Sequence, residues 1–287
     1  MVTGSTSSYG AGSNDGFVLR LGDDGTLVWA KTYGGTGPDA LNCLVYHSSG
    51  NIISCGLTQS AGAGEYDCFV LSIDEDGLIN WASVCGTSRL DRFYSITEGA
   101  ENSLFLSGTY TPGATSHTDM IIAKYSESGA FQWCTDGGGS NYDELYSITV
   151  QSDNNLAACG YTRSFGACSD DCIAIRLSPT GSLLESYTYG GADREDANDI
   201  IETSSRNYMI SGRSRSFSTG DYDNFIINTF DDLSSCCGEE IDIEFSTFPM
   251  SSVSALPDIG ASDFTPTLIW NTGYFIDIEQ DFVIVCP

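Results

Sequence analysis

The sequence predicts an all-β fold, a β-propeller of about five four-stranded repeats followed by a β-rich C-terminal segment. Three observations carry this prediction. One sequence pattern recurs at a fixed spacing of 52 residues. The apolar segments are short and alternate at period two, and no stretch has the 3.6-residue period of an amphipathic helix. A repeat of this length indicates a solenoid, a propeller or an array.

A glycine opens each repeat, an aspartate follows eleven residues later, and further positions keep the same phase. The opening glycines are Gly4, Gly56, Gly108, Gly160 and Gly212, and the aspartates are Asp15, Asp67, Asp119, Asp171 and Asp223. Gly25, Gly77, Gly129 and Gly181 form another series, as do Trp29, Trp81 and Trp133, with Glu185 at the Trp position of the fourth unit. A last aspartate series is Asp39, Asp91, Asp143 and Asp196, where the final step is 53 residues.

Each unit predicts four strands, which in one copy are "DALNCLVY", "NIISCGLT", "DCFVLSI" and "LINWASV". In the third strand Phe69, Leu71 and Ile73 face one way and the intervening residues face the other. A single sheet with two apolar faces cannot cover both of them, so neighbouring units must cover each other. A radial arrangement, with each repeat spanning two adjacent blades, satisfies this requirement for every unit.

Counting the strands divides the chain into repeats over 1–235 and a C-terminal segment over 236–287. The repeat region holds five copies of the second and third strands but four of the first, because the chain begins inside a unit. Either the chain is a piece of a larger propeller, or the missing strand comes from elsewhere. The C-terminal stretches 265–275 and 281–287 are apolar β segments that predict pairing with a sheet edge of the same chain or of a neighbour.

The stretch "GFVLRLGDDGTLVWAKTYGGTGPDA", residues 16–40, and its copies resemble the secreted β-propeller repeat family, often called SBBP, over about residues 1–235. The resemblance implies an extracellular or cell-surface protein and brings no catalytic motif. This chain departs from the family pattern in its many cysteines and in Glu185.

The composition narrows the classes of partner. With 39 acidic and 11 basic residues the formal charge is −28, which disfavours binding to nucleic acid and to anionic membranes and favours cations. No apolar run approaches the ~20 residues of a membrane-spanning helix. The N-terminus has no signal-peptide pattern, so we expect a mature secreted product or a fragment.

Eleven cysteines without a CxxC pair, and two distant histidines, favour disulfides in an oxidising compartment over a zinc site. Two repeat positions hold cysteine together in the second and fourth units and lack it together in the others. This pattern predicts the bridges Cys55–Cys68 and Cys159–Cys172, and a bridge from Cys286 to Cys236 or Cys237. The pairing of Cys43, Cys85, Cys134 and Cys168 stays open, and the odd count leaves at least one cysteine free or paired between chains.

Acidic residues offer only poor metal sites. The repeated aspartates are better explained as caps of the loop before the third strand than as a calcium ring, because equivalent positions in different blades lie far apart. The turn residues Asp23, Asp24, Asp74 and Asp76 resemble the start of calcium loops but lack the spaced ligands and terminal Glu. We expect no cofactor, with calcium as the sole candidate.

Neither His47 nor His117 lies in a triad context and no GxSxG elbow occurs, so we expect no enzyme. The sequence favours an extracellular structural or interaction protein, a self-assembling subunit of a surface appendage, sheath or filament. The alternative is a secreted propeller that binds a glycan or a cation. A glycan site requires exposed aromatic residues at one repeat position, whereas Tyr9, Tyr66, Tyr110 and Tyr222 lie at different offsets.

Overall fold

The computed structural model describes residues 1–113, 115–167, 169–217, 220–248, 251–254 and 260–263. It is an all-β fold of five antiparallel sheets, with a single short 3-10 helix, η1 (Ala100–Asn102), among the described residues. The first sheet contains β1 (Val2–Thr6), β2 (Asp15–Leu21) and β3 (Leu27–Gly34), and the second contains β4 (Asp39–Tyr46), β5 (Ile52–Thr58), β6 (Asp67–Ile73) and β7 (Ile79–Gly86).

The third and fourth sheets repeat the order of the second. The third contains β8 (Arg92–Glu98), β9 (Leu104–Tyr110), β10 (Asp119–Tyr125) and β11 (Phe131–Gly137), and the fourth contains β12 (Asp143–Val150), β13 (Leu156–Thr162), β14 (Asp171–Leu177) and β15 (Leu183–Tyr189). The fifth sheet has β16 (Glu195–Glu202), β17 (Tyr208–Ser214) and β18 (Asp223–Thr229). The four strands predicted for one unit are therefore confirmed, and each unit counted from its glycine spans two sheets.

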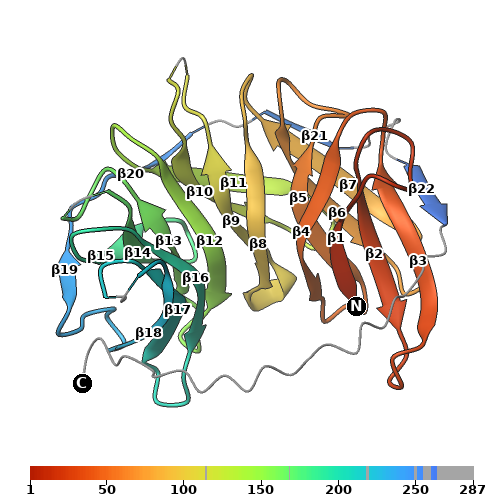
Figure 1. Ribbon diagram of the computed structural model, residues 1–287. Helices are drawn as coiled ribbons and strands as arrows, with labels where there is room; N and C mark the ends of the chain where they lie inside the picture. The colour runs from red at the N-terminus through yellow and green to blue at the C-terminus, as the bar shows by residue number, and fades with distance from the viewer. Residues whose placement is uncertain (114, 168, 218–219, 249–250, 255–259, 264–287) are drawn as a thin grey trace.

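The sheets fan out along an arc, with the first sheet at one end and the fifth at the other (Figure 1). Successive sheets meet mainly through their first strands, since β4 contacts β8, β8 contacts β12 and β12 contacts β16. In the first sheet, whose described strands include no counterpart of β4, β8, β12 and β16, β1 takes that place against β4. The described strands form an open arc of propeller-like repeats rather than a closed ring.

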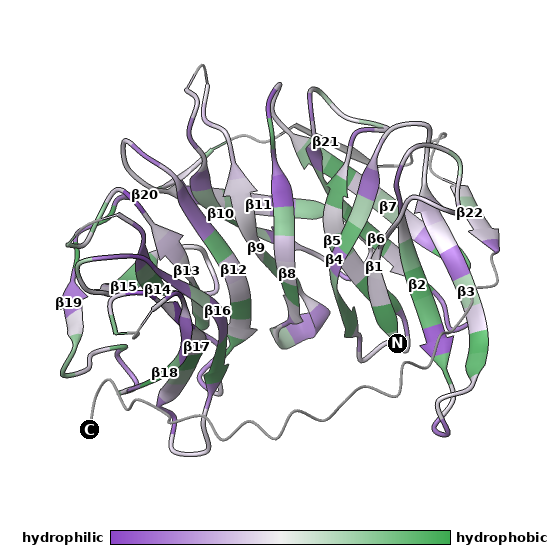
Figure 2. Cartoon of the chain, in the orientation of Figure 1, coloured by the Kyte–Doolittle hydropathy of each residue, from purple (hydrophilic) through white to green (hydrophobic). Residues whose placement is uncertain are grey.

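Apolar side chains between successive sheets make the core. Val18 and Tyr33 of the first sheet pack with Phe69 and Leu71 of the second. In the same way, Cys172 and other apolar residues of the fourth sheet pack against the fifth sheet. Strands β6, β9 and β13 are buried on both faces, because each has a neighbouring sheet on either side. Figure 2 shows hydrophobic stretches along the sheets and hydrophilic residues near the upper ends of β8 and β12.

The opening glycine of each repeat accommodates a bulge in the first strand. The β12–β13 register shifts between Leu145 and Ser147, opposite Gly160. A Cβ on Gly160 would lie 1.9 Å from the backbone oxygen of Glu144, and Gly56, Gly108 and Gly212 meet equivalent carbonyls at 2.0 Å. Gly4 belongs to the sheet without a first strand, and its nearest neighbour is the Phe17 side chain. The strict glycine series therefore follows from the bulge.

The second glycine series and the tryptophans join neighbouring sheets. Gly77 has φ +75° in the turn before the fourth strand, where its N–H donates to the carbonyl of Asp74. The Trp29 indole Nε1 donates to the carbonyl of Glu75 in the next sheet, at 2.9 Å. Glu185, at the Trp position of the fourth unit, instead pairs within its own sheet with Arg176 at 2.8 Å.

The C-terminal segment adds an outer strand to four sheets in reverse order (Figure 1). These strands are β19 (Gly238–Glu240) on β15, β20 (Phe245–Thr247) on β11, β21 (Ser251–Ser254) on β7 and β22 (Gly260–Asp263) on β3. Between them Ile243 is 4% exposed in the core of the third and fourth sheets, and Phe248 stacks on Tyr110 at 4.7 Å. Strands β19, β20, β21 and β22 thus cover the outer edges of four sheets of their own chain.

Among the described residues, the stretch after β18 pairs with the fourth sheet and not with the fifth, because Gly238–Glu240 lies on β15. The described tail strands all lie on the outer edges of their sheets, on the side opposite the first strands. The stretches 265–275 and 281–287 lie outside the described residues. No helix in the described part of the chain has the length and apolarity needed to cross a membrane.

Candidate binding surface of tyrosines and arginines

A buried carboxylate holds the beginning of each first strand in the same way. The Asp143 carboxylate accepts hydrogen bonds from the backbone N–H of Gly139 at 2.9 Å and from the hydroxyl of Thr162. Glu195 accepts from the N–H of Gly191 at 2.7 Å and from the hydroxyl of Ser214 at 2.7 Å. Asp39 and Asp91 take the same place in their sheets.

The fourth member of this series is therefore Glu195 and not Asp196, so the step of 52 residues is kept throughout. Asp196 continues the series by residue type, whereas Glu195 continues it by position. Burial raises the pKa of the Asp91 carboxyl to about 6.

The residue after each cap varies from sheet to sheet and stands directly opposite a second variable residue. These cross-strand pairs are Ala40–Leu57, Arg92–Thr109, Glu144–Tyr161 and Asp196–Arg213. The bulged residue that follows is variable too, as Asn42, Tyr94, Tyr146 and Asn198. The positions at which the repeats differ thus lie together in one patch, next to the capping carboxylate and the bulge that all the repeats share.

Tyrosine rings connect the third and fourth sheets across this patch. The rings of Tyr94 and Tyr146 meet edge to face with centroids 5.0 Å apart, and Tyr146 lies 5.8 Å from Tyr161. The Tyr94 hydroxyl donates to the Glu144 carboxylate at 2.8 Å. Burial, and next the Glu144 charge, raises the pKa of both Tyr94 and Tyr146, so their hydroxyls stay protonated donors.

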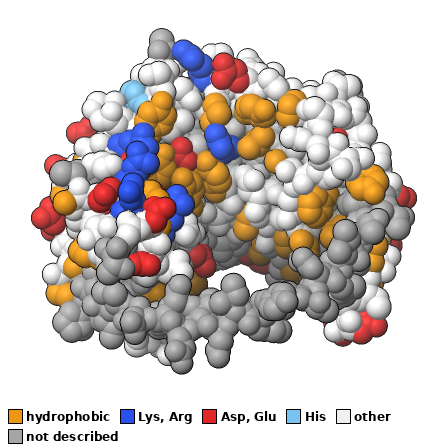
Figure 3. Space-filling model, viewed as in Figure 1, with side chains coloured by type: hydrophobic (Ala, Val, Ile, Leu, Met, Phe, Trp, Pro, Cys, Tyr) orange, Lys and Arg blue, Asp and Glu red, His pale blue; other side chains and the backbone are white. Residues whose placement is uncertain are grey.

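Arginines continue the patch toward the fifth sheet. Arg213 Nε lies 2.7 Å from Asp196 Oδ2, and its guanidinium carbon stands 4.5 Å from the centroid of the Tyr222 ring. Arg163 pairs with Asp170 and lies 5.3 Å from the centre of the Tyr142 ring. Figure 3 shows a band of basic side chains on this face with acidic and hydrophobic ones between them. We name this patch the Tyr–Arg surface. It lies on β8, β12, β13, β16, β17 and adjoining loops, and its members are Arg92, Tyr94, Tyr142, Glu144, Tyr146, Tyr161, Arg163, Asp170, Asp196, Arg213 and Tyr222.

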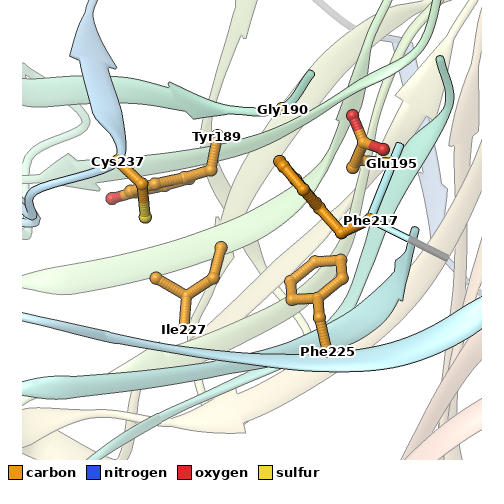
Figure 4. A pocket seen from close by; sticks show the side chains of 7 residues that line it. All are labelled: Tyr189, Gly190, Glu195, Phe217, Phe225, Ile227 and Cys237. Atoms are coloured by element: carbon orange, nitrogen blue, oxygen red, sulfur yellow. The ribbon is translucent and has the colours of Figure 1, made fainter. Parts of the chain in front are cut away.

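A cavity of about 270 Å³ adjoins this surface at Arg92. Its wall is mixed, with Leu57, Leu90 and Tyr66 beside Ser5 and Asn14. A second cavity lies between the fourth and fifth sheets, where Figure 4 shows Phe217 and Phe225 side by side and Tyr189 next to Cys237. Its free volume is about 20 Å³, enough for about one water molecule, so it is a packing defect rather than a ligand site.

The repeated aspartates of the third strand lie apart, one to a sheet. Asp67 accepts hydrogen bonds from the backbone N–H groups of Ala63 and Gly64, and Asp15 accepts one from Gly12. Asp119 is partly buried, whereas Asp223 is exposed on the fifth sheet. Asp171 occupies the corresponding position in the fourth sheet, next to Gly166 and Gly190.

The tryptophans of the second and third sheets also contact the next sheet. Trp81 donates to the carbonyl of Glu127, and Trp133 packs at the turn of Gly181.

The weak calcium candidates are turn residues. Asp24 accepts hydrogen bonds from the N–H and hydroxyl of Thr26, and Asp74 accepts from the N–H groups of Asp76 and Leu78. Asp23 belongs to the same turn as Asp24. Within the described residues no group of three or more His, Cys, Asp and Glu side chains is placed to hold a metal ion.

The predicted bridges Cys55–Cys68 and Cys159–Cys172 are absent, because all four are free thiols. The register explains why: Cys55 lies opposite Val70 and Cys68 opposite Leu57, so the two sulfurs are diagonal neighbours on one face. Burial raises the pKa of all four thiols, which pack as small apolar groups. Cys68 instead faces Cys85, and Cys43 faces Cys55. Cys236 is free and exposed, Cys237 is disulfide-bonded, and Cys168 and Cys286 lie outside the described residues.

The sequence interpretation missed Tyr94, Tyr146 and Arg213, because single tyrosines and arginines carry no motif. Of the loop tyrosines it considered, Tyr66 lines the cavity and Tyr222 lies under Arg213, but Tyr110 is buried. The sequence did contain a signal for these residues, because aligning the repeats on the capping carboxylate places the variable residues immediately after a constant one.

No family model matches the chain. One curated protein is similar to it, an uncharacterized WD repeat-containing protein, L264, of Acanthamoeba polyphaga mimivirus. The two are 24% identical over 140 residues, which cover 41% of this chain and 10% of that protein. This chain therefore spans a small part of the length of its relative. The likeness agrees with propeller-like repeats and shows no activity.

Proposed function

We propose that the protein is a secreted, non-enzymatic repeat protein of the β-propeller kind that binds a glycan on its Tyr–Arg surface. The observation that carries this proposal is the presence of tyrosines at one repeat position, Tyr94 and Tyr146, in contact with each other on neighbouring sheets. A glycan site requires exposed aromatic residues at one repeat position, and the tyrosines of the loops lie at different offsets.

The surrounding groups suit a ligand with many hydroxyls. Exposed Tyr142 and half-buried Tyr146 offer ring surface, and Glu144, Asp196 and Arg213 offer acceptors and donors beside it. Ligand sites commonly combine aromatic walls with a few fixed polar groups. The repeat framework is shared by all sheets, so differences among these residues set specificity without altering the fold.

A glycan array probed with the labelled protein tests this proposal. We expect saturable binding to a subset of glycans, with affinity reduced about tenfold in Tyr146→Ala through loss of ring contact. Tyr46→Ala is the matched control, because Tyr46 is a 55% exposed tyrosine of a first strand that lies away from the bulge. Equal binding by the Tyr146 variant, or no bound glycan at all, contradicts the proposal.

A second candidate is the self-assembling structural subunit that the sequence favoured. It is supported by the outer face of the fifth sheet, where Ile201, Met209 and Ile226 are 51%, 37% and 47% exposed. The face that stacks on the next sheet in every other repeat is open here. The complementary face of the first sheet carries half-buried Leu19 and exposed Val2. A second copy, joined head to tail, would continue the same stacking.

Sedimentation velocity distinguishes this candidate. Assembly predicts oligomers that grow with protein concentration and with added salt, which screens the −28 charge. Ile226→Asp is expected to dissolve them, whereas Leu78→Asp, at an exposed turn residue 57% accessible, is expected to leave them intact. A monomer at all concentrations removes the candidate.

A further inference from the structure

Arg92 differs from the other arginines of the Tyr–Arg surface because it has no anionic partner among the residues that the structure describes. Its Nε is buried without a hydrogen-bond partner, and its guanidinium carbon lies 5.5 Å from the centroid of the Tyr94 ring. In contrast, Arg163 pairs with Asp170 and Arg213 with Asp196. A guanidinium with a buried and unpaired Nε gains most from a carboxylate, which matches its planar fork with two parallel hydrogen bonds.

The fifth sheet shows what the missing partner looks like. There the same cross-strand position joins Asp196 to Arg213, with Nε and Oδ2 2.7 Å apart. In the third sheet Arg92 stands opposite Thr109, whose hydroxyl donates to the carbonyl of Asp119 instead. The same pair of positions thus holds a guanidinium and a carboxylate in the fifth sheet, but a guanidinium without a carboxylate in the third sheet.

The cavity of about 270 Å³ beside Arg92 has room for a ligand group in that place. Leu57, Leu90 and the ring of Tyr66 give it apolar surface, and Ser5 and Asn14 give it hydrogen-bonding groups. Asp39, the acidic residue in its wall, is already occupied by Gly35 N–H, Thr58 and Ser60. The cavity therefore offers one unpaired cation, apolar contacts and a few polar groups.

We propose that this cavity binds a single acidic sugar residue, with its carboxylate on the guanidinium of Arg92. The inference rests on the proposed glycan-binding function and adds the chemistry of one subsite. A sugar ring suits the mixed wall better than a purely apolar or purely ionic group does. The net charge of −28 repels densely anionic chains, so the ligand is a largely neutral glycan with isolated carboxylates.

Calorimetry with two matched sugars tests the proposal. Methyl β-glucuronide carries a carboxylate where methyl β-glucoside carries a hydroxymethyl group, and the rings are otherwise the same. We expect the glucuronide to bind roughly tenfold more tightly or better, as a charge-assisted hydrogen-bond pair implies. The preference is expected to vanish in Arg92→Gln and to fall strongly in Arg92→Lys, which keeps the charge but not the fork.

Arg20→Gln is the control, because Arg20 lies outside the Tyr–Arg surface and already has an acidic partner, Glu75, at 3.6 Å, and this variant is expected to keep the preference. Thermal unfolding of each variant establishes that it is folded before titration. Equal binding of the two sugars overturns the inference and leaves the glycan function standing. N-acetyl-aspartate amide binding as tightly as the glucuronide, dependent on Arg92, overturns the sugar assignment in favour of an acidic peptide. A preference that survives in Arg92→Gln places the carboxylate elsewhere.

Discussion

The fourth and fifth sheets are built from the same repeat, yet they differ in how their third strands are buried. In "DCIAIRL" of β14 both faces are enclosed, with Ile173, Ile175 and Ala174 at 0% exposure. In "DNFIINT" of β18 Phe225 and Ile227 are buried, while Asn224, Ile226 and Asn228 are exposed. One sheet has neighbours on both sides and the other has one. The repeat specifies a strand, and its position in the arc decides whether one face or two become core.

The largest test of this comparison pairs two isoleucines. Ile175→Ala removes a side chain enclosed by two sheets and should lower the free energy of unfolding by about 3 kcal/mol. Ile226→Ala, on the open face, should change it by less than about 0.5 kcal/mol in the monomer. Urea denaturation measures both values. Similar losses at the two sites would show that the open face is covered in solution.

A smaller difference is expected at two glycines of one series. Gly160→Ala places a Cβ 1.9 Å from the Glu144 carbonyl oxygen, so the bulge must open, at a cost of about 2 kcal/mol in the free energy of unfolding. Gly4→Ala meets the Phe17 ring at 2.9 Å but no first strand. A side chain can give way where a backbone cannot, so we expect the lower cost at Gly4. Urea midpoints in the reverse order would refute the bulge as the reason for this series.

The smallest effect concerns the repeated aspartate, which is partly buried in the third sheet and exposed in the fifth. Burial, followed by the charges of Asp143 and Asp136, raises the pKa of Asp119 to about 7. The folded state then binds the proton more tightly than the unfolded state, so this stabilisation is fully present below about pH 4, where the unfolded carboxyl is protonated, and is lost as the pH rises from there through about 7. Asp119→Asn should therefore raise the urea midpoint relative to the wild type, and should raise it more at pH 8 than at pH 5.

Asp223→Asn is the matched control for that measurement, because the same repeat position is exposed there, and we expect no pH-dependent difference. His117→Gln separates the contribution of the imidazole, whose Nε2 lies 3.9 Å from Asp119 Oδ1. An Asp119 variant that is equally destabilised at both pH values would mean that the carboxylate is needed for the fold.

The sequence by itself determined the repeat, the strands within it and the antiparallel order, because period-two alternation and glycine turns act over a few residues. It also determined that sheets must cover one another, since β6 and β14 are apolar on both faces. These are local properties of the chain, and their recurrence every 52 residues makes them recognisable in the sequence. The sequence could not distinguish diagonal cysteines from opposed ones, because Cys55 and Cys68 share a repeat pattern in either register.

Only the tertiary structure decided where the C-terminal segment pairs and which variable residues meet. Strands β19 to β22 are short and pair with edges far away in the chain, a contact that no local pattern encodes. Likewise Tyr94 and Tyr146 are separated by a whole repeat and touch only because successive first strands pack side by side. The repeat period placed equivalent residues in phase, and the curvature of the arc brought them into contact.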